Sequence, residues 1–506
     1  MDSRRGPDVG RSCLTDAAPG HLLLLSYGTT IVWLTGIALA LTITVAQPAW
    51  AQPRIESTPP EAVEGQPVHV VVTGLQPGET IEVHASRKWP AYPTGEDVYL
   101  GWASFTVDAL GTVDLATAVP LGGSSYAGAD CSGLFWSMAP EKRSKLLLKQ
   151  RPAPLSADSL QSGIVRIEVE ASGRIVASTE VRLRGGAADV VVRDVREPGV
   201  IGVYARGSGA SPQPAVIVLG GSEGGLFTAR WAAPILASNG YAVLGVSYFR
   251  DEHGGSQLPP NLENIPLETI ERARDWLAVQ PGVDATRVAV VGVSKGAEMA
   301  LLAATEFPWV AAVGAFAPTH VVWEGIPPDD QPDREAGSSW TYRGKPFPFV
   351  RWSRAAERRS DLTRKATGSA RLTEPHLESL AEFAEDVAAA TIKIERSRAA
   401  IFVAAGTDDG MWPAGYSAER LRDRLAHRDP RLGAVFEIHP TGHLVMGTGW
   451  APTTQFQSQT GRLQGGSARL DAEAQRVIWP AFLRFLRNHF QLPAPDKQPP
   501  DPEGSP

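Results

Sequence analysis

The sequence predicts a two-domain protein in which an all-β domain precedes an α/β domain. Short strand-like segments separated by turn residues fill the first third of the chain. From about residue 190 onward, apolar strand-like runs alternate with helical runs. With 506 residues the chain is long enough for two or three domains. We therefore expect an immunoglobulin-like β-sandwich over residues 52–186 and, over residues 187–492, a parallel sheet covered by helices on both faces.

The first 51 residues have the composition of a secretory signal peptide. A basic start precedes an uncharged stretch from Ala17 to Pro53, and the small residues Ala49 and Ala51 stand before Gln52. This pattern predicts cleavage after residue 51 and a secreted or periplasmic protein without stable membrane insertion. The alternative is a retained membrane anchor, since Leu22 to Ala46 could just span a bilayer.

The first domain is predicted from five segments that read as short strands. Turn residues separate them, and a Ser-Gly pair at 172–173 predicts a β-hairpin between the last two. A Gly- and Ala-rich linker over 185–188 leads into the second domain. The expected strands cover residues 68–73, 80–85, 102–107, 164–170 and 175–183.

The second domain is predicted from continuous apolar strands alternating with amphipathic helices. Residues 319–398 interrupt the alternation with a charged segment that contains Trp and Pro, as a lid or cap insertion would. The tail over 493–506 is rich in Pro, Asp and Gly and is expected to be disordered. The expected strands cover 190–195, 214–219, 241–247, 288–293, 310–316, 401–405 and 434–439, and the expected helices 228–239, 267–279, 417–426 and 472–489.

Ser294 lies at the centre of the most informative motif. The run from Val288 to Val293 reads as a buried strand, and an Ala- and Leu-rich helical run follows the serine. A strand, a sharp turn and a helix with Ser at the apex form the nucleophile elbow of the α/β-hydrolase fold. So tight a turn needs small residues two positions either side of the serine, and Gly292 and Gly296 supply them. The alternative is a plain strand-to-helix turn with a serine cap.

A serine nucleophile needs a base and a carboxylate that orients the base. In this fold the chain order is Ser, acid, His, on loops after later strands. Asp408 and Asp409 follow the strand expected at 401–405, and His443 follows the strand expected at 434–439. We predict His443 as the base and Asp409 as the acid, with Asp408 as the alternative acid.

Two other histidines compete for a role. His439 belongs to an expected strand by periodicity, so we interpret it as structural. His320 ends the segment after the elbow strand, where it is either a substrate-pocket residue or a satisfied polar residue at the edge of the insertion.

An acyl oxyanion needs backbone N–H donors. We expect one from Lys295, directly after the nucleophile, and the other from the glycine-rich loop over 220–225, where Ser222 is our choice. The spacing of this loop does not match a dinucleotide fingerprint, and no acidic residue ends the next strand.

Charge and composition exclude several other functions. The net charge of −7 gives no support for nucleic-acid binding, and no Cys/His spacing suits zinc. We expect no metal and no cofactor, and a small-molecule acyl thioester or ester as the binding partner. The sequence gives no indication of oligomeric state.

Motifs in both domains resemble the family of acyl-CoA thioesterases and bile acid-CoA:amino acid N-acyltransferases. The resemblance covers nearly all of the chain after the predicted signal peptide, and its motifs agree in order and spacing. They are Gly-Leu-Gln-Pro-Gly at 74–78, Trp-Ala-Ser-Phe at 102–105, the run 123–140, the elbow, Gly-Thr-Asp-Asp-Gly-Met-Trp at 406–412 and Gly-His at 442–443.

This resemblance implies an acyl-CoA thioesterase-like serine hydrolase that converts acyl-CoA to fatty acid and CoA through an acyl-enzyme. It implies Ser294 as nucleophile, Asp409 as acid and His443 as base, and Trp412, three residues after Asp409, supports that choice over Asp408. Members that conjugate bile acids tend to carry Cys as the nucleophile, so Ser294 favours hydrolysis over amino-acid N-acyl transfer.

The predicted export conflicts with a CoA substrate, because acyl-CoA is a cytoplasmic metabolite. A bacterial periplasmic enzyme would rarely meet it, which leaves an exported carboxylesterase or peptidase as an alternative. A non-catalytic lipid- or carbohydrate-binding protein is a further alternative. Six basic residues of the insertion either contact CoA phosphates or form a solvated face: Arg343, Lys345, Arg351, Arg354, Arg358 and Arg359.

Overall fold

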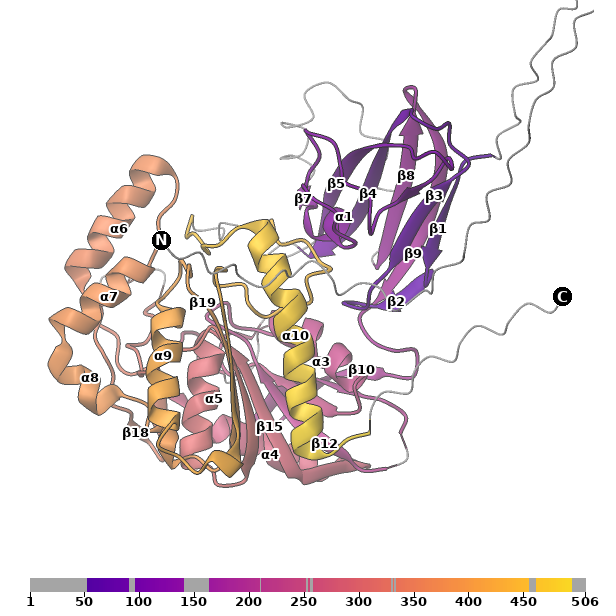
Figure 1. Cartoon of the computed structure of the whole chain (residues 1–506). Coiled ribbons are helices and arrows are strands. Elements are labelled where there is room, and N and C mark those ends of the chain that lie inside the picture. Colours follow the sequence, from indigo (N-terminus) through magenta and orange to yellow (C-terminus); the bar gives the residue numbers. More distant parts are fainter. Residues whose placement is uncertain are drawn as a thin grey trace, which may run out of the picture.

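A computed structural model gives the fold of residues 52–493, apart from short gaps at 91–95, 141–162, 210, 252–253, 255–257, 329–330, 332–333 and 455–460. The predicted signal peptide, and the predicted tail beyond Pro493, lie outside the described residues. Figure 1 shows two lobes, with the strands of the first 184 residues in the smaller one and the long mixed sheet in the larger.

The smaller domain consists of two sheets that enclose one apolar core. Its strands alternate buried and partly exposed residues, as in β3, because one face of each sheet lies on that core. The predicted hairpin is confirmed: β8 and β9 pair antiparallel. One sheet has the order β1 (Arg54–Thr58), β3 (His69–Thr73), β6 (Val113–Asp114); the other has the order β2 (Glu61–Val63), β9 (Arg174–Arg184), β8 (Ile164–Ala171), β4 (Thr80–Pro90), β5 (Glu96–Thr106), β7 (Ala139–Pro140). The short helix α1 (Gly133–Trp136) lies beside β5.

The larger domain is built on an eight-stranded sheet. The first two strands of this domain, Val191–Glu197 and Val200–Arg206, pair antiparallel with their neighbours in the sheet. The remaining strand pairs are parallel. Every residue of β12, β13 and β19 is buried, which requires cover on both faces of the sheet. The order is β10 (Val191–Glu197), β11 (Val200–Arg206), β13 (Ala242–Val246), β12 (Gln213–Leu219), β15 (Val283–Val293), β16 (Val310–Phe316), β19 (Ala400–Gly406), β20 (Ala434–His439).

Helices connect the parallel strands and supply that cover. The first and last of them share a face, because Trp231 of α3 packs on Trp479 of α10 with ring centroids 5.3 Å apart. The predicted α/β-hydrolase arrangement is therefore confirmed by a mainly parallel sheet with crossover helices. The helices are α3 (Phe227–Ala237), α4 (Glu268–Ala278), α5 (Lys295–Glu306), α9 (Ala414–Leu425) and α10 (Ala468–Phe490).

The segment between β16 and β19 forms a separate layer beside the sheet. Its first half contributes β17 (Trp340–Tyr342) and β18 (Lys345–Pro346) to a small sheet with β14 (Ile265–Pro266). Its second half forms α6 (Arg354–Thr367), α7 (Thr373–Glu382) and α8 (Ala384–Ala390), drawn in orange in Figure 1, and a short 3₁₀ turn, η2 (Ile394–Arg396). The Ser353 hydroxyl caps α6 at its start, and Gly368, with φ of 85°, ends it.

The two domains are joined by polar contacts between α10 and the segment around α1. Asp130 accepts hydrogen bonds from Arg476 of α10 at 3.1 Å and from the Trp136 indole at 2.9 Å. The loop after β20 also reaches the sandwich, because the Thr453 N–H donates to the carbonyl of Trp136 at 3.0 Å. The domains therefore share an ordered interface.

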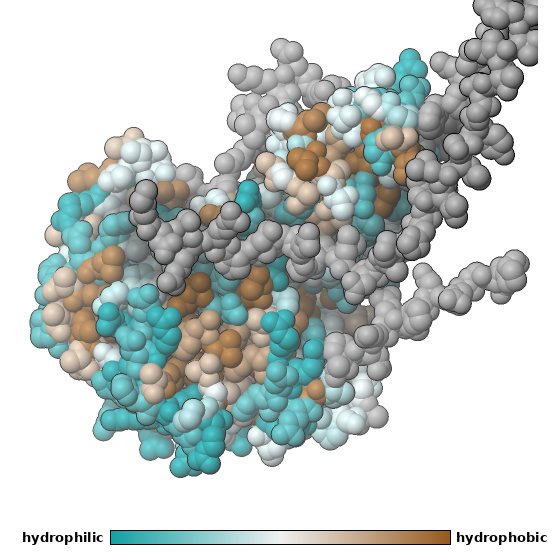
Figure 2. Space-filling view, viewed as in Figure 1, coloured by the Kyte–Doolittle hydropathy of each residue, from teal (hydrophilic) through white to brown (hydrophobic). Residues whose placement is uncertain are grey.

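No helix in the described ranges is both long and apolar enough to cross a bilayer. Figure 2 shows hydrophilic residues along the lower edge of the larger domain and separate hydrophobic patches on both domains.

Candidate active site

Ser294 occupies a strained turn between β15 and α5. Its φ of 56° and ψ of −121° are sparsely populated for a residue with a side chain. The serine N–H donates to the carbonyl of Phe316 at 2.9 Å, which holds the turn against the neighbouring strand β16. The sharp turn thus puts the hydroxyl at the carboxyl end of the parallel strands, where α/β sheets bind ligands.

Two glycines make this turn sterically feasible. A Cβ on Gly292 would lie 2.1 Å from the carbonyl oxygen of Gly296. One on Gly296 would lie 2.2 Å from the carbonyl oxygen of Gly220, in the loop after β12. The glycine pair therefore closes the elbow and also brings it against the glycine-rich loop.

His443 and Asp409 form a buried pair at the same end of the sheet. His443 Nδ1 lies 2.7 Å from Asp409 Oδ2, and the two residues are 8% and 2% exposed. The other carboxylate oxygen of Asp409 accepts hydrogen bonds from the N–H groups of Met411 at 2.7 Å and Trp412 at 3.2 Å. Because a carboxylate only accepts, Nδ1 carries the proton and Nε2 is left as the basic nitrogen.

Asp408 faces away from His443. Its carboxylate accepts from Arg371 at 2.8 Å and from the Gly466 N–H at 3.0 Å, and its side chain is 54% exposed. Since only Asp409 contacts the histidine, the geometry distinguishes the two aspartates that the sequence left as alternatives.

The two other histidines lie apart from this pair. His439 Nε2 lies 2.9 Å from Glu437 on the same strand. His320 Nδ1 lies 3.0 Å from the Ser417 hydroxyl, and burial lowers the pKa of His320 to about 4. Neither residue lines the pocket at Ser294.

The loop after β12 is held rigidly beside the serine. A Cβ on Gly221 would lie 3.1 Å from the Ser294 Cβ. Glu223 accepts from the Gly221 N–H at 3.0 Å, and the Tyr248 hydroxyl donates to the Gly220 carbonyl at 2.7 Å. Within the described ranges, the N–H groups of Ser222 and Lys295 have no hydrogen-bond acceptor.

Ser294 and Ser222 line a pocket of about 190 Å³ together with the rings of Trp323, Trp352, His376 and Trp412. The insertion supplies most of the lining. His443 lies next to it, because its ring centroid is 6.0 Å from that of Trp412. In the described part of the chain no hydrogen bond joins Ser294 Oγ to His443; in unliganded sites such catalytic bonds are often long. The lining residues are Ser222, Ser294, Lys295, Trp323, Gly325, Ile326, Pro327, Trp352, Arg354, Glu357, Leu372, His376, Met411, Trp412 and Arg462.

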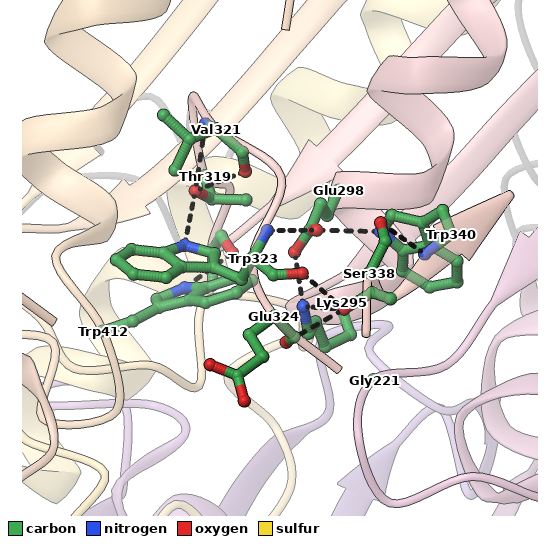
Figure 3. Close-up of polar contacts among 12 residues, drawn as sticks. Gly221, Lys295, Glu298, Thr319, Val321, Trp323, Glu324, Ser338, Trp340 and Trp412 are labelled. Carbon is green, nitrogen blue, oxygen red and sulfur yellow. Dashed lines mark hydrogen bonds and ion pairs between the residues drawn. The ribbon is translucent and has the colours of Figure 1, made fainter. Parts of the chain in front are cut away.

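A buried ion pair involves Lys295, the residue directly after Ser294 (Figure 3). Lys295 Nζ lies 2.9 Å from Glu298 Oε2 and donates to the Ser339 hydroxyl at 2.7 Å. Glu298 Oε1 also accepts from the N–H of Trp323 at 3.0 Å and from the Trp340 indole at 2.8 Å. Burial lowers the pKa of Lys295 and raises the pKa of Glu298, while their mutual attraction opposes both shifts.

The insertion residues that line the pocket were not identified from the sequence. His376 of α7 lies within an aromatic cluster, with ring centroids 4.7 Å from Trp323 and 4.3 Å from Trp352. The Trp residues of the insertion were noted in the sequence. Their spacing along the chain did not predict that their rings would line the same pocket as Ser294.

Three of the six basic residues considered in the insertion form ion pairs. Arg351 contacts Glu385 and Asp386, Arg354 contacts Glu324 and Glu357, and Arg359 contacts Glu378. Of the six basic residues considered from the sequence, Arg354 is the one that lines the pocket. The charge of Arg351, Arg354 and Arg359 is therefore balanced by neighbouring carboxylates. Among the described residues, no group of three or more His, Cys, Asp or Glu is placed to hold a metal ion.

Comparison with known proteins decides the family. Residues 65–197 match the model described as the acyl-CoA thioester hydrolase/BAAT N-terminal region. Residues 265–492 match the model described as BAAT/acyl-CoA thioester hydrolase C terminal.

The chain belongs to this family. It is similar to acyl-coenzyme A amino acid N-acyltransferase 1 of Mus musculus, at 27% identity over 86% of this chain and 98% of the relative. It is also similar to mitochondrial acyl-coenzyme A thioesterase 2 of Homo sapiens, at 27% identity over 84% of this chain and 82% of the relative. Human bile acid-CoA:amino acid N-acyltransferase is 32% identical over 54% of this chain and 63% of its own length.

These matches confirm the predicted family and the prediction of an acyl-CoA thioesterase-like enzyme. They support acyl-CoA thioester hydrolysis or acyl transfer to an amino acid, and both reactions proceed by attack on an activated acyl carbonyl.

Proposed function

We propose that this protein is a serine hydrolase that cleaves acyl thioesters through an acyl-enzyme. Ser294 acts as nucleophile, His443 as general base and Asp409 as the residue that orients the base. The observation that carries this proposal is the buried His443–Asp409 pair at 2.7 Å, at the same sheet edge as the strained Ser294. Three loops far apart in the sequence supply the three residue types that acyl transfer requires.

In the first step, Ser294 Oγ attacks the thioester carbonyl while His443 Nε2 accepts the hydroxyl proton. The carbonyl π bond breaks and leaves a negative charge on its oxygen. When that oxygen reforms the double bond, the C–S bond breaks, and His443 donates the proton to the leaving thiolate. The products of this step are a free thiol and an ester of Ser294.

The oxyanion is stabilised by the N–H groups of Lys295 and Ser222. The Lys295 N–H is the first of α5, where helical N–H groups have no partner within the helix and the helix dipole favours negative charge. Ser222 is the better second donor, because Glu223 already occupies the Gly221 N–H. Losing one such donor costs about 10²–10³ in kcat in other acyl-transfer enzymes.

In the second step, a nucleophile releases the acyl group from Ser294. Water, deprotonated by His443, gives the carboxylic acid; an amino-acid amine would give an amide instead. Ser294 favours water, because conjugating members of the family tend to carry Cys. We therefore propose hydrolysis as the main reaction, with amino-acid N-acyl transfer as the second candidate.

The test is turnover of acyl-CoA and of a p-nitrophenyl acyl ester by Ser294→Ala. We expect a fall of about 10⁵-fold in kcat with an unchanged unfolding midpoint. Adding glycine or taurine and measuring the ratio of amide to acid separates transfer from hydrolysis. Unchanged turnover by the variant would remove Ser294 from the mechanism, and failure to label wild type with a fluorophosphonate would favour a binding protein.

We further propose that residues 1–51 direct export and are removed. Their basic start, uncharged apolar stretch and Ala-Trp-Ala site support this. Mass spectrometry of the mature protein from its native host tests it. A start at Gln52 would favour an exported carboxylesterase or another thioesterase over an enzyme for cytoplasmic acyl-CoA. An intact N-terminus in the cytoplasmic fraction would contradict export.

A further inference from the structure

The lining of the pocket contains a histidine that the proposed reaction does not use. His376 is 4% exposed and lines the pocket together with Ser294. Its Nδ1 lies 2.8 Å from the carbonyl oxygen of Leu372, one turn earlier on the same helix. A carbonyl only accepts, so Nδ1 carries the proton and donates it there.

The other ring nitrogen is therefore a hydrogen-bond acceptor. Burial lowers the pKa of His376 to about 3, so the ring is neutral throughout the physiological range. Within the described ranges, no donor contacts Nε2. An acceptor in the lining of a pocket is satisfied when a water molecule or a ligand supplies the donor.

Aromatic rings fix the orientation of this acceptor. The centroids of Trp323 and Trp352 lie 4.7 and 4.3 Å from that of His376, and Trp412 lies 6.1 Å away. The Trp323 indole is held in turn by Thr319 at 3.0 Å, and the Trp412 indole by the Ala317 carbonyl at 3.1 Å. With the indole N–H groups committed elsewhere, Trp323 and Trp412 present apolar surface to the pocket.

The residues that line the pocket differ in chemistry and in burial. Trp323, Trp412 and His376 are 1–5% exposed, whereas the side chains of Arg354 and Glu357 are 22% and 32% exposed. An apolar acyl group gains from burial against rings, and a polar thiol leaving group is better solvated near charged residues. The acyl group therefore fits against the buried rings.

Resting on the proposed function, we infer that this enzyme selects compact acyl groups that carry a hydroxyl, which donates a hydrogen bond to His376 Nε2. The volume of about 190 Å³ is below the roughly 300–1,000 Å³ of sites for drug-sized ligands and suits a single ring. Flat aromatic walls favour such a ring by stacking or edge contacts. His376 is then a specificity-determining residue of the acyl subsite.

The experiment compares kcat/KM for phenylacetyl-CoA with the 2-, 3- and 4-hydroxyphenylacetyl-CoA isomers. We expect wild type to prefer at least one isomer by about tenfold, since a neutral hydrogen bond contributes about 1 kcal/mol and its loss leaves an unpaired acceptor. His376→Leu should abolish this preference, which is measured as the ratio of kcat/KM between each hydroxylated isomer and phenylacetyl-CoA in the same variant. His376→Gln, which can place an amide oxygen near the position of Nε2, should restore part of it.

Leu377→Ala is the matched control, because Leu377 is exposed on the same helix and does not line the pocket. Equal kcat/KM for all four substrates in wild type, or an unchanged preference in His376→Leu, would overturn the inference. Either result leaves the proposed function intact if Ser294 still labels with a fluorophosphonate and p-nitrophenyl acetate is still hydrolysed. Hydrolysis of p-nitrophenyl acetate by Ser294→Ala at the wild-type rate would instead reject the proposed function.

Discussion

At the scale of single residues, the clearest distinction is between the two adjacent aspartates after β19. Asp409 is buried against His443, while Asp408 is half exposed against Arg371. They are one position apart, so no sequence pattern of charge or hydropathy separates them. The direction of each side chain is set by the loop, in which Asp409 forms an isolated bridge with Gly465.

Asp409→Asn is expected to lower kcat by about 10³–10⁴-fold, because an amide can hold His443 in the wrong tautomer. Asp408→Asn keeps the size and removes the charge on the same loop, so we expect a change below threefold. Steady-state kinetics on a p-nitrophenyl ester measures both. A similar loss in the two variants would mean that loop stability, not orientation of His443, limits the rate.

His320 predicts a pH-dependent contribution to stability. Burial is the main cause that lowers its pKa to about 4, with Arg420 and Arg424 adding repulsion, against about 6.5 in the unfolded chain. Because the unfolded state binds the proton more readily, this contribution is complete above pH 6.5 and is lost as pH falls toward 4. Urea unfolding at pH 7 and pH 5 should show a smaller acid destabilisation for His320→Asn than for wild type. An equal change in both proteins would contradict the assignment.

At the scale of elements, sequence patterns located the sheet well. β16 and β20 begin and end at the predicted residues, because each is an apolar or alternating run bounded by turns. β11 was missed: a strand was predicted over 190–195 and none over Val200–Arg206, which follows β10 after a two-residue turn and pairs with it antiparallel. The turn at Ser294 could be predicted because the apolar strand, the two glycines and the helical run are contiguous in the sequence.

The pocket wall could not be predicted, because it depends on how the insertion packs on the sheet. Glu298 lies on α5, but its partners Trp323 and Trp340 come from the insertion, 25 and 42 positions later. These hydrogen bonds are tertiary contacts, so no local sequence pattern predicts them. Glu298 thus fastens the insertion to the helix that follows the nucleophile.

Glu298→Ala is expected to destabilise the protein by about 3–5 kcal/mol, because Lys295 would remain buried without its partner. Replacing both residues, as Lys295→Met with Glu298→Leu, should recover a substantial part of that loss, since no unpaired charge is then buried. Urea denaturation of the two variants tests this. If the double variant is no more stable than Glu298→Ala, the bonds to the two tryptophans carry the stability.

At the scale of the whole molecule, both domains support the loop that carries His443. Asp471 of α10 accepts from the Gly442 N–H at 2.9 Å, and burial raises the pKa of Asp471 to about 6. Gln475, one turn later, donates to the Leu444 carbonyl at 2.7 Å. The next residue, Arg476, is paired with Asp130 of the sandwich at 3.1 Å. The histidine loop is therefore held by a helix that the other domain anchors.

Arg476→Ala should lower kcat severalfold with little change in KM, because it loosens the support of His443 without touching the pocket. It should also cost about 1–3 kcal/mol of unfolding free energy, since Asp130 loses a charged partner. Arg469→Ala is the matched control: Arg469 pairs with Glu473 on the exposed side of the same helix. Equal effects of the two substitutions would argue against a role for the interface.

The shared support of the histidine loop has an evolutionary consequence. The loop packs on the sandwich through Trp450, whose ring centroid is 5.4 Å from that of Phe135, and through Thr454, which donates to the Met138 carbonyl at 2.6 Å. A gene encoding only the larger domain would retain all three proposed catalytic residues. It would lose the sandwich contacts that support the loop carrying His443. Recombination at the linker is therefore constrained, and we expect the two modules to be inherited together.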